Sequence, residues 1–285
     1  MSKIAILLST YNSVSYLKEQ LNSIISQTYT KWELYIHDDR SNDGTIAIIN
    51  SYVEQDNRIH LMKDNLRRGA AGSFMWLLEN TEADFYMFCD HDDIWLPQKI
   101  EITLKQMLSY SSKQESTPII VATDAKVVNA KLDIIHSSFW HYCHTRVKYF
   151  SDKYFYLFYN NIPGCCMMFN DAAKKVALPY HEGSFIHDSW VIVSCLFNHG
   201  IIIPIHQSQM LYRQHSNNLV GTRESPSLVQ QIKAVNSLTK KTYQRYTTAR
   251  FFVKMGFLPF LFLKVKYLLL FHFERFLDNI HSKSS

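Results

Sequence analysis

Apolar strands that alternate with amphipathic helices are the feature that most limits how this chain can fold. Strands are expected at residues 3–9, 32–37, 58–63, 84–89 and 118–124, where short runs are apolar and rich in β-branched residues. Helices are expected behind Asn12-Ser13, after 41–45, over about 70–80 and behind Pro97. Apolar strands joined through helices form mostly parallel sheets that helices cover on both faces. The first half is therefore predicted to be an α/β unit.

The alternation stops at about Lys126. Residues 126–136 allow a hairpin, and 137–160 are aromatic and rich in His without a clear pattern. A short strand is expected at 164–170, a helix at 186–200, and two edge strands at 201–206 and 208–215. From Ser225 the pattern is helical, basic and aromatic. These features predict one α/β domain over 1–222 and a helical C-terminal extension over 223–285.

Composition and charge exclude several classes of protein. Hydrophobic residues make up 47% and charged residues 19% of the 285, which is typical of a globular chain. A net charge of +5 suits phosphates or an anionic membrane surface, and we expect no nucleic-acid partner. The five cysteines form no CxxC pair, which predicts reduced thiols in a cytosolic protein. The N-terminus has too few apolar residues for a signal peptide, and no apolar run approaches the roughly 18 that a membrane span needs.

Polar clusters follow three of the predicted strands. Residues 9–12 close the first strand, 37–39 the second and 90–93 the fourth. Ligands in parallel sheets bind at the carboxyl ends of strands, so the three clusters predict one site. The acidic spacing at Asp90 and Asp92 suits a divalent cation such as Mg²⁺ or Mn²⁺. The alternative is a helix cap ahead of Pro97, for which one Asp is enough.

A zinc site is the other metal centre that the sequence raises. His141, Cys143 and His144 lie close together in the chain. A second group of ligands with fitting spacing does not follow them, and three such groups seldom make a closed tetrahedral site. Zinc is therefore rejected.

Several segments together resemble a known family. Residues 6–29 (ILLSTYNSVSYLKEQLNSIISQTY), 33–45 (ELYIHDDRSNDGT) and 85–101 (FYMFCDHDDIWLPQKIE) are similar to the nucleotide-binding half of family-2 glycosyltransferases of the GT-A fold. HDSW at 187–190 and YRQHSNN at 212–218 resemble the second half of the bacterial rhamnosyltransferase-like members. The resemblance covers roughly 3–221 and implies a nucleotide-binding half over about 1–125 and an acceptor half over about 126–222. It also implies an inverting transfer from a nucleotide-diphosphate sugar to an acceptor hydroxyl.

The resemblance assigns roles to several residues near the nucleotide and the metal, and to one base. The loop of Thr10 and Tyr11 would lie with Asp39 against the base and ribose, while Asp92 would bind the metal directly. Asp90 would face the ribose or a metal-bound water, and Asp93 would cap the helix behind Pro97. Asp188 matches the catalytic base, which takes the acceptor proton. Helix capping is the alternative for Asp39 and Asp188, and in Asp188 both roles can hold.

Further residues carry weaker assignments by the same resemblance. His215 would reach the metal or the diphosphate, and Arg213 would contact phosphate, as would Arg67 or Arg68; a structural role for each is the alternative. Ser73 stands where the family's pattern leads us to expect Asn, which puts the contacts of that turn in question. The acceptor side is assigned to Trp95, Gly164 and Trp190.

The implied function is metal-dependent transfer of a sugar, with rhamnose the first guess, from a UDP- or dTDP-sugar. The implied acceptor is a polyprenyl-diphosphate-linked glycolipid or a polysaccharide of bacterial O-antigen or capsule. Residues 251–276 mix Lys and Arg with aromatics, which indicates either a core-packing helix pair or an interfacial helix. We expect a cytoplasmic protein at the inner face of the membrane. The alternatives are a non-catalytic nucleotide-sugar-binding protein and a nucleotidyltransferase, although STYNSVSYL lacks the glycines of a phosphate loop.

Overall fold

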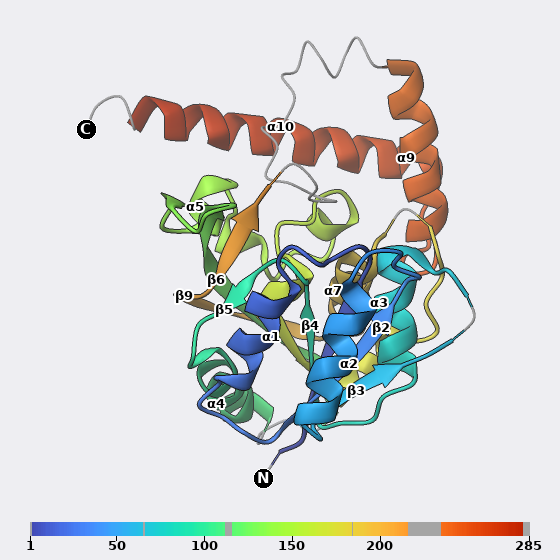
Figure 1. The fold of residues 1–285 in the computed structure, drawn as a ribbon. Coiled ribbons are helices and arrows are strands. Elements are labelled where there is room, and N and C mark those ends of the chain that lie inside the picture. Colours follow the sequence, from blue (N-terminus) through green and yellow to red (C-terminus); the bar gives the residue numbers. More distant parts are fainter. Residues whose placement is uncertain (1, 65, 112–115, 184, 216–234, 282–285) are drawn as a thin grey trace.

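The computed structural model describes residues 2–64, 66–111, 116–183, 185–215 and 235–281 (Figure 1). Its first part alternates strands and helices as the hydrophobic pattern predicts. The elements are β1 (Ile4–Thr10), α1 (Leu17–Ile25), β2 (Trp32–Asp38), α2 (Thr45–Gln55), β3 (Ile59–Met62), α3 (Gly69–Glu79) and β4 (Phe85–Cys89). Every residue of β1 and β4 is buried, because helices cover both faces of the sheet there.

The second part contains longer strands and several short helices. The elements are β5 (Ile94–Trp95), α4 (Lys99–Ser111), β6 (Ile119–Asn129), β7 (Ile134–His136), α5 (Phe139–Tyr142), η1 (Val147–Tyr149), η2 (Phe155–Leu157), η3 (Gly164–Cys166), β8 (Met167–Asn170), α6 (Asp171–Ala177), α7 (His187–Phe197) and β9 (Ile201–Gln214). The hairpin expected over 126–136 is present, since β6 and β7 pair antiparallel. The aromatic segment 137–160 forms α5, η1 and η2.

The strands form one mixed sheet in the order β3-β2-β1-β4-β8-β6-β9-β5, with β7 beside β6. The pairs β3–β2, β2–β1, β1–β4 and β6–β9 are parallel, and β8 is antiparallel to both of its neighbours. The predicted α/β fold with a sheet flanked by helices is confirmed, and the fold is of the GT-A type. The first four strands are parallel as expected, but β5 and β7 also pair antiparallel, so the sheet as a whole is mixed. The short strand β8 joins the two parallel parts into one sheet.

The prediction of two separate strands after α7 is wrong. One strand, β9, runs from Ile201 to Gln214 and pairs with β6 along its length, with register shifts near Asp124. Pro204 suggested a break because proline cannot donate to a ladder. It is tolerated because β5 pairs only with Met210 and Leu211, which leaves the first half of β9 paired with β6 alone.

The C-terminal extension is helical, as predicted, and consists of α9 (Val235–Ala249) and α10 (Phe257–His281). Helix α10 crosses the end of the molecule that lies opposite the N-terminus (Figure 1). It packs on the aromatic segment, where Tyr267 donates to Asp152 at 2.7 Å and Phe260 is fully buried against Phe158. The expected boundary at 222–223 lies outside the described residues. No helix in the described ranges is long and apolar enough to cross a membrane.

Candidate functional site

Three strand ends place the polar clusters at one edge of the sheet. Strand β1 pairs parallel with β2 on one side and with β4 on the other, so all three end together. Thr10 is opposite Asp38 and donates its hydroxyl to that carboxylate at 2.8 Å. Asp38 also accepts the backbone N–H of Ser41 at 2.8 Å, which fixes the turn before α2. Asp38 therefore ties the end of β1 to the turn before α2.

The carboxylate of Asp39 lies at the N-terminus of α3. It is buried and accepts the backbone N–H of Arg68 at 2.6 Å and of Gly69 at 3.1 Å. Gly69 has a φ of 65°, a left-handed conformation that glycine adopts without strain. The turn 67–69 thus holds Asp39 where α3 begins, which favours a negative charge. The alternative role, a cap for α2, does not apply to Asp39.

Two neighbouring arginines have different surroundings. The side chain of Arg68 forms an ion pair with Asp64 and lies over the Trp76 ring, so it is a structural residue. The side chain of Arg67 is 60% exposed, lies 4.7 Å over the half-exposed Tyr11 ring and approaches Asp39 to 3.8 Å. The side chain of Arg68, which the resemblance assigns to phosphate, is thus engaged with Asp64, whereas that of Arg67 is exposed beside Asp39.

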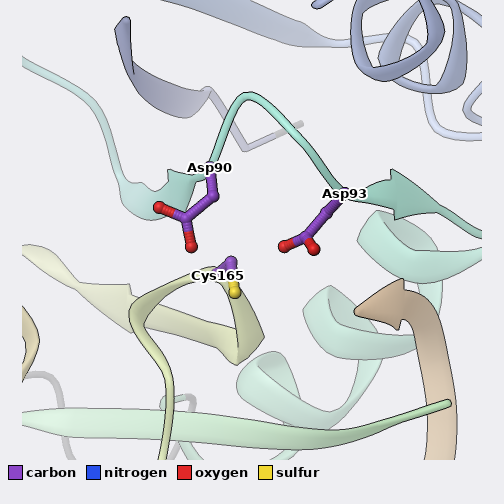
Figure 2. A group of neighbouring side chains, drawn as sticks. All are labelled: Asp90, Asp93 and Cys165. Carbon is purple, nitrogen blue, oxygen red and sulfur yellow. The ribbon is translucent and has the colours of Figure 1, made fainter. Parts of the chain in front are cut away.

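The acidic turn after β4 forms a buried cluster with η3. One ligand atom from each of Asp90, Asp93 and Cys165 lies within 4.8 Å of the others. Figure 2 shows both carboxylates directed toward the side on which Cys165 lies, with its thiol below and between them. One oxygen of Asp93 accepts the backbone N–H of Arg213 at 3.0 Å, while its other oxygen, Oδ2, is buried without a hydrogen-bond partner among the described residues.

The crowding of carboxylates changes their acidity. Burial, followed by repulsion from Asp92, raises the pKa of Asp90 to about 7. Burial, followed by repulsion from Asp92 and Asp90, raises the pKa of Asp93 well above its usual range. A hydrogen bond with Cys166, together with burial, raises the pKa of the Cys165 thiol as well. A protonated thiol is a poor ligand for Mg²⁺ or Mn²⁺, so the carboxylates are the ligands to consider.

Asp92 and His215 meet although they are far apart in the sequence. Oδ2 of Asp92 lies 2.8 Å from Nε2 of His215, and both side chains are nearly buried. The imidazole ring also packs against Tyr16 at 4.8 Å. The two residues that the sequence assigns to the metal are thus brought together at the end of β9.

Two buried cations lie beside the acidic turn. Lys99, in the first turn of α4, is fully buried; its ammonium donates to the Cys165 carbonyl at 2.7 Å and lies 4.6 Å over the Trp95 ring. Its positive charge opposes the upward shift of the Asp90 pKa. Arg213 is also buried, and all three of its guanidinium nitrogens donate to protein acceptors, on Asp92, on residue 130 and on Glu19.

The environment of Arg213 corrects its predicted role. Its guanidinium forms bonds to two backbone carbonyls and an ion pair with Glu19, so it ties the acidic turn to the hairpin and to α1. A phosphate contact does not fit these surroundings. Asp93 likewise does not cap the helix behind Pro97, because the first-turn N–H of Ile100 donates to Gln27 Oε1 at 3.1 Å and Asp93 accepts from Arg213.

The expected base, Asp188, begins α7 and is held by the turn that carries Cys165. Its Oδ2 accepts the backbone N–H of Gly164 at 3.2 Å, and its Oδ1 accepts that of Ser189 at 2.5 Å. A Cβ on Gly164 would lie 2.9 Å from Nε2 of His187, so only glycine allows η3 to pack this closely on α7. His187 stacks on Phe74 at 4.2 Å, and burial lowers the pKa of its imidazole.

Two tryptophans do not lie where the acceptor side was expected. Trp190 is buried, donates to the Ala177 carbonyl at 2.6 Å and packs against Phe252 ahead of α10. Trp95 is 2% exposed and lies under the Lys99 ammonium. Both belong to the core, and neither presents a surface to an acceptor.

The sequence interpretation missed two residues of the site. Cys165 was predicted only to be one of the reduced thiols, and nothing in its sequence neighbourhood signals that the turn reaches Asp90. Lys99 did carry a signal, because it shares the i, i+4, i+8 face of α4 with the buried Thr103 and Met107. A lysine on the apolar face of a helix indicates a buried partner.

The chain is similar to known glycosyltransferases. The family model described as "Glycosyl transferase family 2" matches residues 5–177 of this chain. The glucosyltransferase WfgD of Escherichia coli, named as acting on UDP-Glc and α-D-GlcNAc-diphosphoundecaprenol, is 33% identical over 37% of this chain and 41% of its own length. The putative teichuronic acid glycosyltransferase TuaG of Bacillus subtilis is 32% identical over 38% of this chain and 43% of its length. The matches thus span less than half of these relatives.

Solved structures share the fold over most of the chain. S. aureus TarS 1-349 in complex with UDP-GlcNAc matches 94% of this chain and 72% of that chain, with a TM-score of 0.57 and 17% identity. Mannosyltransferase PcManGT from Pyrobaculum calidifontis, in complex with GDP-Man and Mn²⁺, matches 95% of this chain and 70% of that chain, with a TM-score of 0.59 and 15% identity. Because the family model matches more than half of the 285 residues, the chain belongs to glycosyl transferase family 2.

Proposed function

We propose that the protein is a metal-dependent inverting glycosyltransferase that moves a sugar from a UDP- or dTDP-sugar to an acceptor hydroxyl. One observation carries this proposal. The turn η3 places Cys165 in the acidic cluster and hydrogen-bonds Asp188 through the adjacent Gly164, so a metal-type site and a candidate base share one turn. A nucleotidyltransferase no longer fits, since the chain belongs to another family.

The buried carboxylates fit a divalent cation. Oδ2 of Asp93 is buried without a hydrogen-bond partner among the described residues, and burial, together with repulsion from Asp92, raises the pKa values of Asp90 and Asp93. A bound cation would offset both the burial of these carboxylates and their repulsion. Asp92 and Asp90 would hold it, with His215 at the side of Asp92. A bound Mg²⁺ or Mn²⁺ would offset the charge that grows on the leaving diphosphate.

Asp188 is the proposed base. Both of its oxygens accept backbone N–H groups, so the carboxylate is held in one orientation before the acceptor binds. In an inverting transfer it would take the proton of the acceptor hydroxyl while that oxygen attacks the anomeric carbon. His187 supports the geometry instead of reacting, because its ring is stacked on Phe74 and its pKa is lowered by burial.

The nucleotide would bind where β1 and β2 end. Asp39 would accept hydrogen bonds from the base or ribose, and the half-exposed Tyr11 with Arg67 above it would border the same site. Thr10 is buried and shapes the loop through its bond to Asp38. WfgD is named for UDP-Glc, which favours UDP over dTDP and glucose over the first guess, rhamnose.

The acceptor is proposed to be a polyprenyl-diphosphate-linked glycolipid, or else a growing polysaccharide of the bacterial surface. The name of WfgD contains a diphosphoundecaprenol-linked GlcNAc, and that of TuaG contains teichuronic acid. Gly164 lies beside Asp188 and so remains the acceptor-side residue that the geometry supports. An acceptor of this kind would place the enzyme at the inner face of the cell membrane.

A screen of nucleotide sugars tests the proposal. UDP-glucose, UDP-GlcNAc and dTDP-rhamnose are incubated with the full chain, with Mn²⁺ or with EDTA, and release of UDP or dTDP is measured. We expect release that requires the metal, with the rate in Asp92→Asn and Asp188→Asn reduced about 10³-fold. Binding of UDP with Mn²⁺ in calorimetry, without release from any donor even when acceptor lipid is added, would instead identify a non-catalytic binding protein.

A further inference from the structure

Helix α10 carries an apolar stripe that faces away from the protein. Phe262 is 75% exposed and Leu258 is 66% exposed, values far above those of core residues. The exposed apolar side chains recur every three or four residues, which places them on one face of the helix: Leu258, Leu261, Phe262, Val265, Leu269 and Phe273. A continuous stripe of this kind marks a surface that contacts an apolar partner.

The opposite face of α10 fixes how the helix is oriented. Phe260 and Tyr267, about two helical turns apart, are both buried in the body of the protein. Tyr267 donates to Asp152 at 2.7 Å, and Glu274 accepts from Tyr149 at 2.7 Å. The stripe therefore does not turn inward, and the helix presents it along the end of the molecule that it crosses (Figure 1).

The charges of the C-terminal helices are almost all positive. Residues 240–274 contain seven basic side chains and one acidic one, which are Lys240, Lys241, Arg245, Arg250, Lys254, Lys264, Lys266 and Glu274. Arg245 is partly buried and donates to the Leu157 carbonyl, and Lys264 is half-buried, so five of the seven basic side chains are exposed. Glu274 forms ion pairs with Lys148 and Arg146. Lys254 and Lys266, which border the stripe, are exposed. A partner that suits this surface is apolar and negatively charged.

We propose that the outward face of α10 docks on an anionic phospholipid bilayer, with the helix lying in the plane of the membrane. The leucines and phenylalanines would enter the boundary between headgroups and acyl chains, while Lys254 and Lys266 contact phosphate groups. No helix in the described part of the chain can cross a bilayer, which is in keeping with a helix that lies on it. A second copy of the chain fits less well, because two such basic segments would face each other.

The docking surface goes beyond the proposed sugar transfer and can be tested apart from it. The stripe contains none of the residues that are assigned to nucleotide, metal or acceptor. The full chain is sedimented with vesicles of phosphatidylcholine alone and with vesicles of equal parts phosphatidylcholine and phosphatidylglycerol. We expect binding to the anionic vesicles that weakens as salt rises, and much weaker binding to the neutral ones.

Two sets of variants assign the binding to the stripe. Leu258→Ser/Phe262→Ser/Leu269→Ser should lower vesicle affinity at least about tenfold, whereas the exposed pair Ile134→Ser/Ile135→Ser on β7 should leave it unchanged. Lys254→Glu/Lys266→Glu should remove the preference for anionic lipid, and Lys105→Glu/Lys131→Glu should not. Thermal unfolding of each variant confirms that it is folded, as expected for exposed positions.

The proposal is wrong if the wild type stays in the supernatant with anionic vesicles, or if the triple serine variant binds them as well as the wild type does. It is also wrong if the wild type is a dimer in sedimentation equilibrium, the triple variant is a monomer, and neither binds vesicles. In that case the stripe is an interface between two copies.

Discussion

The backbone N–H of Gly164 donates to Oδ2 of Asp188 at 3.2 Å, and the next residue in the chain, Cys165, closes the acidic cluster. Two chemical requirements of sugar transfer, a base for the acceptor and a site for the diphosphate, therefore depend on one short turn. Helix α4 also holds this turn in place, because the buried ammonium of Lys99 donates to the Cys165 carbonyl at 2.7 Å. Changes in this turn should affect catalysis more than they affect folding.

Substitution of Gly164 by Ala tests this dependence. The new Cβ would lie 2.9 Å from His187 Nε2, and the His187 ring cannot move away because it is stacked on Phe74. The turn must shift instead, so kcat should fall about 10²-fold while the free energy of unfolding falls by about 1–3 kcal/mol. Gly256→Ala is the matched control, since its nearest contact would be an ordinary 3.6 Å. A wild-type kcat in Gly164→Ala would show that the turn does not position the base.

Substitution of Lys99 by Met removes a buried charge but keeps the aliphatic chain. The Cys165 carbonyl would lose its donor, and the acidic turn would lose a nearby positive charge. The free energy of unfolding should fall by about 3 kcal/mol in urea titrations. Lys105→Met, on the exposed side of the same helix, should change it by less than about 0.5 kcal/mol. Equal effects of the two substitutions would contradict a structural role for the buried ammonium.

The alternation of apolar strands and helices made the first four strands predictable: β1 and β4 are buried on both faces of the sheet, and β2 and β3 continue the same parallel order toward its edge. The same pattern failed for β9, since a bulged pairing with β6 carries the strand past Pro204. The helix expected at 186–200 is present as α7, but every residue from His187 to Leu196 is buried, so no amphipathic face shows which way Trp190 points.

The sequence could predict that a cation site follows β4, but not which of its carboxylates lie together. Three carboxylates after β4 indicate a cation, and their position at the edge of the sheet follows from the parallel strands. Which of them meet depends on the loop geometry between β4 and β5, for which sequence periodicity gives no rule. For this reason Asp93 was read as a helix cap, whereas the structure turns it toward Asp90 and Cys165.

Mutation of Arg67 should change the KM for the nucleotide sugar, whereas mutation of Arg213 should change the stability of the fold. Arg67 is exposed beside Tyr11 and Asp39, so Arg67→Ala should raise the KM for the nucleotide sugar about three- to tenfold and leave the thermal midpoint unchanged. The comparison with Arg68→Ala, which breaks an ion pair with Asp64, separates a binding effect from a structural one. An unchanged KM in Arg67→Ala would remove Arg67 from the nucleotide site.

Arg213→Lys keeps the charge but loses the planar fork. Lysine cannot bond to the Asp92 carbonyl, the carbonyl of residue 130 and Glu19 at once, so the free energy of unfolding should fall by about 2–4 kcal/mol. Denaturant titration measures this loss, and Arg250→Lys, at an exposed position, is the control. A normal stability together with a raised KM would restore the phosphate contact that the sequence suggested.

Added Mn²⁺ should stabilise the folded protein, because it relieves the repulsion among Asp90, Asp92 and Asp93. At a hundredfold excess over its Kd, a cation that binds only the folded state contributes about 2.7 kcal/mol, which corresponds to a rise of about 5 °C in the thermal midpoint. Asp92→Asn should abolish most of this rise, while Asp133→Asn, which changes an exposed carboxylate outside the acidic turn, should preserve it. EDTA should reverse the rise in the wild type. If Mn²⁺ raises the midpoint equally in Asp92→Asn, the cation binds elsewhere and the carboxylates at the end of β4 are not its ligands.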